Sequence, residues 1–213
     1  MSAYKVADAS GLIKLDAMEN PYTWPEDLTD QWLEKLRYCE LNRYPDPDAG
    51  ALCTTLKQLD RVPENCDILL GNGSDEIIQL LLMALPADST VLAPEPTFVM
   101  YRQISQVLGL NYQGIPLLEN SFELDPKAML KAIHQFRPAI IFLAFPNNPT
   151  GNLFDSDVID EILKAAPGLV VLDEAYAPFA NASYIEQLAE CGNLLVMRTV
   201  SKLGLAGLRL GYI

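Results

Sequence analysis

Short apolar runs alternate with helix-forming segments along most of this chain, and that alternation limits its fold more than any other feature. Runs that are apolar throughout are typical of parallel strands whose two faces are both buried. We therefore predict an α/β fold of three layers, in which a mostly parallel seven-stranded sheet carries helices on both faces. The seven runs span 67–70, 90–93, 110–117, 139–144, 169–172, 194–197 and 208–213.

Prolines and helix-capping residues divide the chain between these strands. Residues 41–213 are predicted to form the large domain, in which Thr97, Asp125 and Asp155 each cap a helix. Residues 1–40 are predicted to form an N-terminal arm, extended at its prolines, and a first helix. That helix should carry its apolar side chains on one face, at Leu28, Trp32, Leu33 and Leu36.

The composition argues against several classes of protein. The formal net charge of −13 makes nucleic acid an unexpected partner, because phosphate backbones bind basic surfaces. His134 is the only histidine and the four cysteines lack metal-ligand spacing, so we expect neither a metal site nor a Ser-His-Asp triad. His134 itself should lie at a helix end or in solvent. The sequence has no signal-like region and no membrane-spanning stretch, which makes a cytoplasmic location the expectation.

Polar clusters follow four of the predicted strands, at the edge where open α/β sheets bind ligands. Each cluster alone has a simpler interpretation, as a turn, a structural cap or a surface loop. A lysine at the end of a buried strand is costly, however, unless partners or chemistry require it there. Lysine is also the residue that forms Schiff bases once burial lowers its pKa. The clusters contain Gly73 and Ser74, Asn147 and Asn148, Asp173, and Ser201 with Lys202.

Together the clusters match the chemical needs of one cofactor, pyridoxal phosphate (PLP), an electron sink for carbanions next to an amine. Its ring nitrogen needs a carboxylate, and its phenolic oxygen needs hydrogen-bond donors. Its phosphate needs amides, hydroxyls and an arginine, and its aldehyde needs a lysine. The residues for these four needs are, in that order, Asp173; Asn148 and Tyr176; Gly73, Ser74, Ser201 and Arg209; and Lys202.

Seven motifs carry a resemblance to a known family. In this order along nearly the whole chain, they resemble those of the fold type I PLP-dependent aminotransferases of class I/II. Within that family the chain is most similar to the histidinol-phosphate aminotransferases. The motifs are ENPY (19–22), RYPDP (43–47), GNGSDE (71–76), PEPTF (94–98), FPNNPTG (145–151), VLDEAY (171–176) and RTVSKLGLAGLRLGY (198–212).

The resemblance implies a role for each matched residue around the cofactor ring. Lys202 would bind the cofactor aldehyde and later move a proton between the substrate α-carbon and the cofactor. Asp173 would pair with the ring nitrogen. Asn148 and Tyr176 would hold the phenolate oxygen, and Phe98 would stack on the ring, where many relatives carry tyrosine.

Other matched residues imply contacts beyond the ring. Arg209 would bind the phosphate, although many relatives have one more residue between the lysine and this arginine. Tyr44 would reach the phosphate of a neighbouring subunit, which implies a homodimer with shared active sites. Tyr22 and Asn148 would lie near the substrate. The GNGSDE motif would contribute three residues to the cofactor site: Gly73, Ser74 and Asp75.

The resemblance also implies a reaction, the exchange of an amino group between glutamate and imidazole-acetol phosphate, which yields histidinol phosphate in histidine biosynthesis. Family members continue for more than a hundred residues beyond position 213, so we expect this chain to be a large domain without its C-terminal small domain. Such a fragment is expected to turn over poorly or not at all. Two alternatives stay open, a related PLP enzyme such as a threonine-phosphate decarboxylase and a non-catalytic scaffold or dimerisation fragment.

Overall fold

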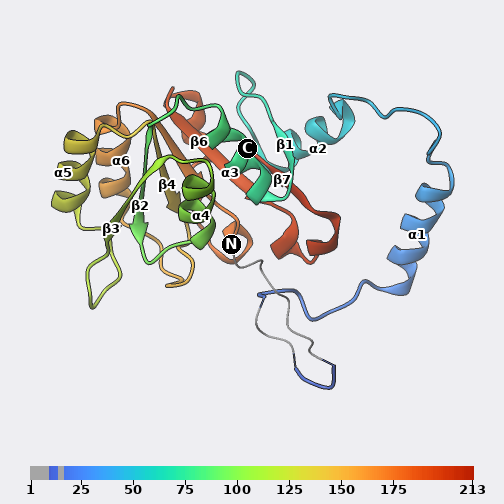
Figure 1. Cartoon of the computed structure of the whole chain (residues 1–213). Helices are drawn as coiled ribbons and strands as arrows, with labels where there is room; N and C mark the ends of the chain where they lie inside the picture. Colours follow the sequence, from blue (N-terminus) through green and yellow to red (C-terminus); the bar gives the residue numbers. More distant parts are fainter. Residues whose placement is uncertain (1–9, 14–16) are drawn as a thin grey trace.

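The described part of the chain forms one seven-stranded sheet flanked by helices (Figure 1). The computed structural model describes residues 10–13 and 17–213. The strand order is β1-β7-β6-β5-β4-β2-β3. Strand β7 is antiparallel to β1 and to β6, and the other neighbouring strands are parallel to each other, which confirms the mostly parallel sheet. The strands are β1 Leu70–Asn72, β2 Thr90–Glu95, β3 Asn111–Pro116, β4 Ile140–Ala144, β5 Leu169–Asp173, β6 Leu194–Thr199 and β7 Leu210–Tyr212.

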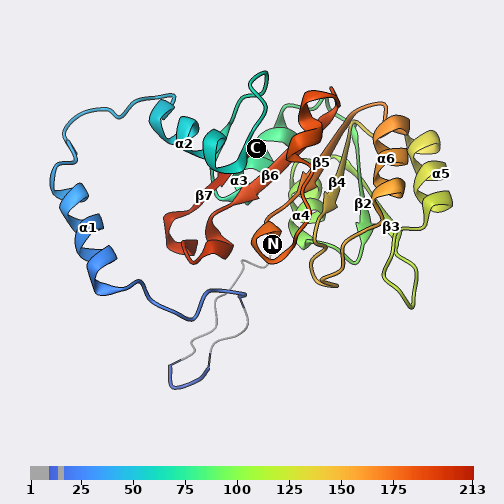
Figure 2. The same ribbon diagram turned by 180° about the vertical axis from the view of Figure 1, so that it is seen from behind.

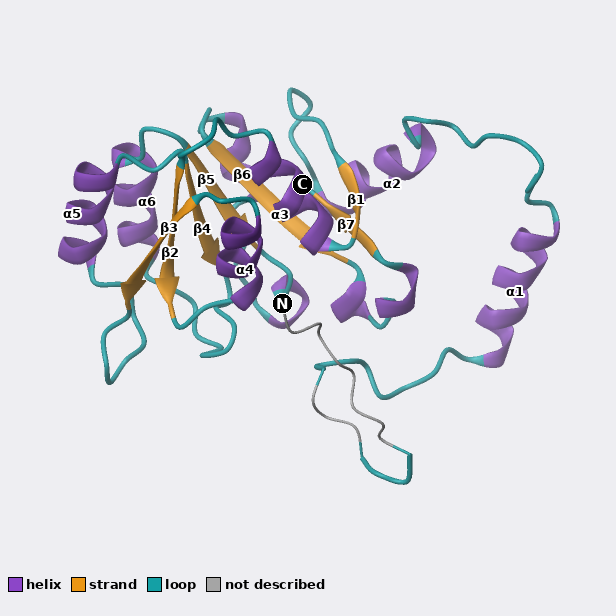
Figure 3. Ribbon diagram, viewed as in Figure 1, coloured by secondary structure: helices purple, strands orange, loops and turns teal. Residues whose placement is uncertain are grey.

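Helices cover both faces of the sheet, as Figure 3 shows. Helices α3 and α4 pack in one hydrophobic cluster, and α5 and α6 pack in another on the opposite face. Short 3-10 turns occupy 177–179, 185–189, 201–203 and 206–208. The α-helices are α1 Glu26–Arg37, α2 Gly50–Asp60, α3 Ser74–Met83, α4 Val99–Val107, α5 Pro126–Phe136 and α6 Ser156–Ala165.

Strand β4 shows why its sequence is apolar throughout. Ile140 and Phe142 pack in the cluster of α3 and α4, whereas Ile141 and Leu143 pack in the cluster of α5 and α6. All four side chains are fully buried. Successive side chains of a strand point to opposite faces, so a strand covered on both sides needs an apolar residue at every position.

Two of the three predicted helix caps are confirmed. Asp125 accepts hydrogen bonds from the backbone N–H groups at the start of α5, and Asp155 does the same for α6. The prediction for Thr97 is wrong, because α4 begins only at Val99 and no side chain caps it. Buried Thr97 instead donates from Oγ1 to Oδ1 of Asn147, at 2.9 Å. The Thr97 hydroxyl therefore binds the loop that follows β4 instead of the backbone at the start of α4.

Strand ends also differ from the sequence expectation. Strand β1 begins at Leu70 rather than at residue 67, and it extends to Asn72, inside the segment predicted as a turn. Strand β7 covers 210–212 rather than 208–213, because the residues before it form a 3-10 turn. Strand β1 lies at the edge of the sheet and β7 lies next to it, and these two short strands pair with each other, so tertiary pairing rather than local sequence sets their limits.

The first helix forms as predicted, but its apolar face is not covered. No residue of α1 is buried, and Figures 1 and 2 both show it set away from the sheet. The four predicted apolar side chains, Leu28, Trp32, Leu33 and Leu36, are between 40% and 52% exposed. The division of the chain at residue 40 stays a prediction. None of the described helices is long and apolar enough to cross a membrane.

Candidate active site

A cavity of about 630 Å³ opens at the carboxyl ends of the central strands. The segment Ala17–Glu19 lines one side of it, and the ends of β2, β4, β5 and β6 supply other parts of its wall. The sheet topology therefore assembles the polar clusters that are far apart in sequence, as expected for this class of fold. The predicted site residues that line the cavity are Ser74, Asp75, Phe98, Asn148, Asp173, Tyr176, Ser201, Lys202 and Arg209.

Lys202 lies in the 3-10 turn that follows β6, and its side chain is partly buried. Its Nζ donates a hydrogen bond to the backbone oxygen of Ala17, at 3.3 Å, and lies 5.1 Å from the centre of the Tyr176 ring. Burial lowers the pKa of Lys202, and the charge of Glu19 opposes part of that effect. A lysine with a lowered pKa has a larger fraction of its side chain in the neutral amine form at neutral pH, and this form attacks a carbonyl.

Asp173 ends β5 as a buried carboxylate, only 4% exposed. Its Oδ2 accepts a hydrogen bond from the hydroxyl of Tyr101 at 2.6 Å, and its Oδ1 accepts one from the backbone N–H of Ala175 at 3.0 Å. Burial raises the pKa of Asp173 to about 6, although both hydrogen bonds lower it in part. The carboxylate is thus desolvated, oriented and ready to pair with a cationic ring nitrogen.

The sequence analysis missed Tyr101. This side chain is fully buried, stacks on Phe142 with ring centres 4.6 Å apart, and meets the edge of Phe98 at 5.5 Å. One signal was present in the sequence, because Tyr101 lies three residues after Phe98 and therefore on the same face of a helix. A buried tyrosine hydroxyl needs a partner, but only the fold shows that the partner is Asp173.

The opposite end of the cavity has the features of an anion site. Gly73 has φ +78° and lies directly before α3, whose first backbone N–H groups lack helical partners. The positive φ at Gly73 favours glycine, and a Cβ there would meet the guanidinium of Arg209, which would have to move away. Ser201 shares a 2.9 Å hydrogen bond with Thr199, and both hydroxyls border the cavity.

Asp75 lies in the first turn of α3 and lines the cavity. Among the residues that the structure describes, its buried Oδ1 atom has no hydrogen-bond partner. Burial raises the pKa of Asp75, while the charge of Arg209 lowers it in part. A buried carboxylate oxygen without a donor is unfavourable, and it is expected where a ligand completes the contacts. The amides, hydroxyls and arginine of this end fit a phosphate group, whereas the Asp75 oxygen would accept a hydrogen bond from a donor on a bound ligand.

The FPNNPTG loop contributes one asparagine to the cavity and uses the other for support. Asn148 is partly buried and lines the cavity. Asn147 is almost fully buried and donates to the Pro96 backbone oxygen and to the Thr150 hydroxyl. The loop is thereby fixed to the segment that precedes α4, which keeps Asn148 at the cavity wall.

Two predicted site residues lie elsewhere in this structure. Tyr22 is 83% exposed and Tyr44 is fully exposed, and neither lines the cavity. Their roles, at the substrate and at a neighbouring subunit's phosphate, stay predictions. His134 lies exposed in the last turn of α5, as expected for a residue at a helix end. No group of metal-ligating side chains is found in the described residues.

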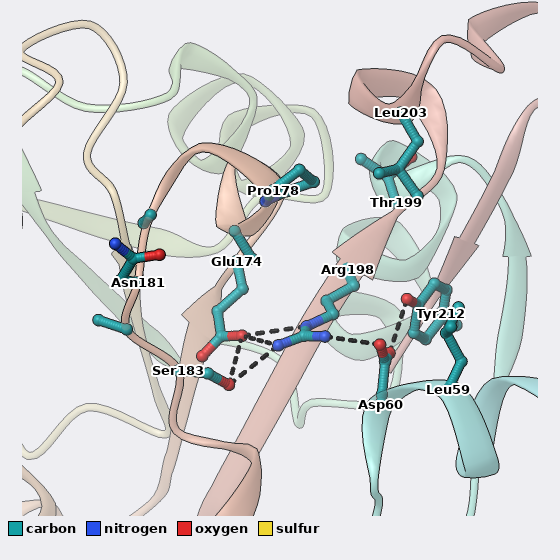
Figure 4. A pocket seen from close by; sticks show the side chains of 13 residues that line it. Leu59, Asp60, Glu174, Pro178, Asn181, Ser183, Arg198, Thr199, Leu203 and Tyr212 are labelled. Carbon is teal, nitrogen blue, oxygen red and sulfur yellow. Dashed lines mark hydrogen bonds and ion pairs between the residues drawn. The ribbon is translucent and has the colours of Figure 1, made fainter.

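A second cavity, of about 510 Å³, lies beside the first and is built around Arg198 (Figure 4). Arg198 extends from β6 between two carboxylates, with Nη1 2.7 Å from Asp60 and Nη2 2.7 Å from Glu174. Its Nη2 also donates to the hydroxyl of Ser183, and Tyr212 donates to Asp60. Each charge in this cluster has a partner, which is typical of a structural network rather than of a binding site.

Comparison with known proteins agrees with the geometry of the first cavity. The family model for aminotransferase class I and II matches residues 10–213. The chain belongs to this family. The match covers both ends of the cavity, from the segment before α1 to the end of β7, so the whole candidate site lies within it.

Individual members of the family resemble this chain closely but are longer. Histidinol-phosphate aminotransferase 2 of Nitrosococcus oceani is 56% identical over 100% of this chain and 59% of the relative. The solved structure of histidinol-phosphate aminotransferase from Sinorhizobium meliloti, in complex with pyridoxal-5'-phosphate, has a TM-score of 0.77 and 26% identity over 92% of this chain and 54% of that one. The chain thus spans about three fifths of the length of this curated relative.

A decarboxylase has a similar fold. L-threonine-O-3-phosphate decarboxylase from Porphyromonas gingivalis aligns with a TM-score of 0.70 and 27% identity, over 88% of this chain and 58% of that one. Together with the aminotransferase structures, it confirms the predicted fold type I architecture. The shared fold does not by itself separate the two reactions.

Proposed function

We propose that this chain is the cofactor-holding part of a histidinol-phosphate aminotransferase. The protein would exchange an amino group between glutamate and imidazole-acetol phosphate, with PLP as its cofactor. One observation carries the proposal: Lys202, with a lowered pKa, shares a cavity with the buried carboxylate of Asp173 and the Gly73–Arg209 anion site. The 56% identity to a histidinol-phosphate aminotransferase supports this choice of substrate.

The residues of the cavity divide the work between them. PLP, when bound, supplies an electron sink for the negative charge that develops on the substrate α-carbon. Lys202 offers a neutral amine for covalent attachment and then acts as the base that moves a proton. Asp173 provides the negative charge that keeps a ring nitrogen protonated, while Asn148 and Tyr176 donate to the phenolate oxygen. Arg209 and the N-terminus of α3 bind the phosphate.

Borohydride reduction tests the covalent role of Lys202. The chain is mixed with PLP, reduced with borohydride and analysed by mass spectrometry. We expect one pyridoxyl group on Lys202 in the unchanged chain and none in Lys202→Ala. The control is Lys131→Ala, on the exposed side of α5, which should be labelled like the unchanged chain. Equal labelling of Lys202→Ala and the unchanged chain would refute the proposal.

Unreduced samples of the same proteins separate the alternatives. A threonine-phosphate decarboxylase would attach the cofactor in the same way but release carbon dioxide from its substrate, whereas an aminotransferase would convert glutamate to its keto acid. A scaffold would show no labelling that depends on Lys202. No contact among the described residues favours the decarboxylase or the scaffold. A homodimer with shared sites is also part of the proposal and rests on the sequence resemblance, and a cytoplasmic location remains the expectation from the sequence.

A further inference from the structure

Tyr101 connects two residues of the candidate site without lining the cavity itself. It lies in the first turn of α4, where its ring is held between the face of Phe142 and the edge of Phe98. Its hydroxyl points to the end of β5 and donates to Asp173 at 2.6 Å. Since Phe98 is the proposed stacking residue and Asp173 the proposed partner of the ring nitrogen, Tyr101 contacts both.

The carboxylate of Asp173 depends on this hydroxyl. Within the described ranges no cation forms an ion pair with Asp173, and its other hydrogen bond comes from the Ala175 backbone. The charged groups that act on it, Asp75 from α3 and the adjacent Glu174, are both acidic. Burial and these two charges favour the neutral acid, and the Tyr101 hydroxyl is the one side chain that opposes them.

We propose that Tyr101 is a positioning residue of this active site, whose hydroxyl keeps Asp173 ionised and fixes its orientation toward the cofactor ring nitrogen. This inference rests on the proposed function, and it adds a residue that touches neither cofactor nor substrate. A phenylalanine at position 101 would keep both ring contacts. The hydroxyl is therefore separable from the packing, and its described partner is the site carboxylate.

The first test compares Tyr101→Phe with a matched control, Tyr184→Phe. Tyr184 is also buried against an aromatic ring, that of Phe145, but its hydroxyl has no hydrogen-bond partner among the described residues. We expect Tyr101→Phe to weaken PLP binding about tenfold at pH 7.5, the value of one hydrogen bond to a charged group. Tyr184→Phe should change the affinity less than twofold. Equal affinities of Tyr101→Phe and the unchanged chain would overturn the proposal.

An Asp173→Asn background shows whether Tyr101 acts through Asp173. The neutral amide removes the charge that the hydroxyl is proposed to stabilise, so adding Tyr101→Phe should then change PLP affinity less than twofold. A tenfold loss in both backgrounds would mean that the Tyr101 hydroxyl affects PLP affinity independently of the Asp173 charge, and would refute the positioning role.

A measurement without cofactor distinguishes failure of this inference from failure of the proposed function. Because the hydroxyl lowers the pKa of Asp173, Tyr101→Phe should raise the apparent pKa seen in the pH dependence of urea unfolding, whereas Tyr184→Phe should not. If the unchanged chain binds no PLP but this shift is found, the proposed function fails and the Tyr101–Asp173 coupling stands. If PLP labels Lys202 but no shift is found, the coupling fails alone.

Discussion

Two adjacent residues at the end of β5 face different surroundings, and the contrast separates the active site from its support. Asp173 faces the Lys202 cavity, whereas Glu174 faces the Arg198 cavity and forms an ion pair there. In both places a tyrosine donates to an aspartate: Tyr101, which does not line the Lys202 cavity, donates to Asp173, and Tyr212 donates to Asp60 in the Arg198 cavity. Only the Arg198 cavity pairs its aspartate with an arginine as well.

The pKa shifts favour the neutral forms of the groups in the Lys202 cavity and the charged form of Arg198 in the other cavity. In the Lys202 cavity, burial raises the pKa of Asp173 and Asp75 and lowers the pKa of Lys202, so each shift favours the neutral form. In the Arg198 cavity, burial alone would lower the pKa of Arg198, but Glu174 and Asp60 raise it overall. A ligand can compensate charges whose pKa burial shifts toward the neutral form, and such groups cluster at functional sites.

The largest effect is expected from Arg198→Ala. This change would leave the carboxylates of Asp60 and Glu174 buried without their cation, and breaking a buried pair in this way costs about 4 kcal/mol of unfolding free energy. Urea unfolding measures it. The matched variant is Arg209→Ala, in the other cavity, which should change the unfolding free energy by less than about 0.5 kcal/mol because Arg209 is exposed. Similar losses in both variants would contradict the comparison.

A slightly smaller effect is expected from the titration of Asp173. Its pKa in the folded chain, about 6, lies above the unfolded value of 3.8, so between these pH values the folded state binds more protons than the unfolded state. The unfolding free energy should therefore fall by about 3 kcal/mol as the pH rises from about 3 to about 7.

The difference between the unchanged chain and Asp173→Asn isolates this contribution, because the other carboxylates titrate in both proteins. Urea unfolding of the two, measured at each pH, gives the difference directly. A difference that stays constant across the window would mean that Asp173 is not held against its preferred protonation state.

The smallest of these effects concerns cofactor affinity. Arg209→Ala should weaken PLP binding about 100-fold, or about 2.7 kcal/mol, because the proposed charge-assisted contact of arginine with the phosphate would be lost. Equilibrium titration measures the affinity. The control is Arg37→Ala on α1, whose guanidinium pairs with Glu34 on the surface and should not affect binding. An unchanged affinity in Arg209→Ala would remove Arg209 from the proposed phosphate site.

Much of the candidate site was predictable because it lies where strands end. Apolar runs located the ends of β5 and β6, and the residues that follow them, such as Asp173 and Lys202, line the cavity as expected. Thr97 was misjudged because its partner comes from a loop 50 residues away. Tyr101 was missed for the same reason, since its partner is 72 residues distant.

The sequence by itself determined the fold class, the parallel sheet and the chemistry available to the site, because hydrophobic periodicity and reactive side chains are local properties. Only the tertiary structure decided which charges are compensated. Asp173 and Glu174 are adjacent acidic residues in the sequence, yet Glu174 forms an ion pair with Arg198 whereas Asp173 forms none with the described residues. That difference depends on which side chains α4 and β6 bring to each face of β5. Local sequence does not determine such long-range contacts.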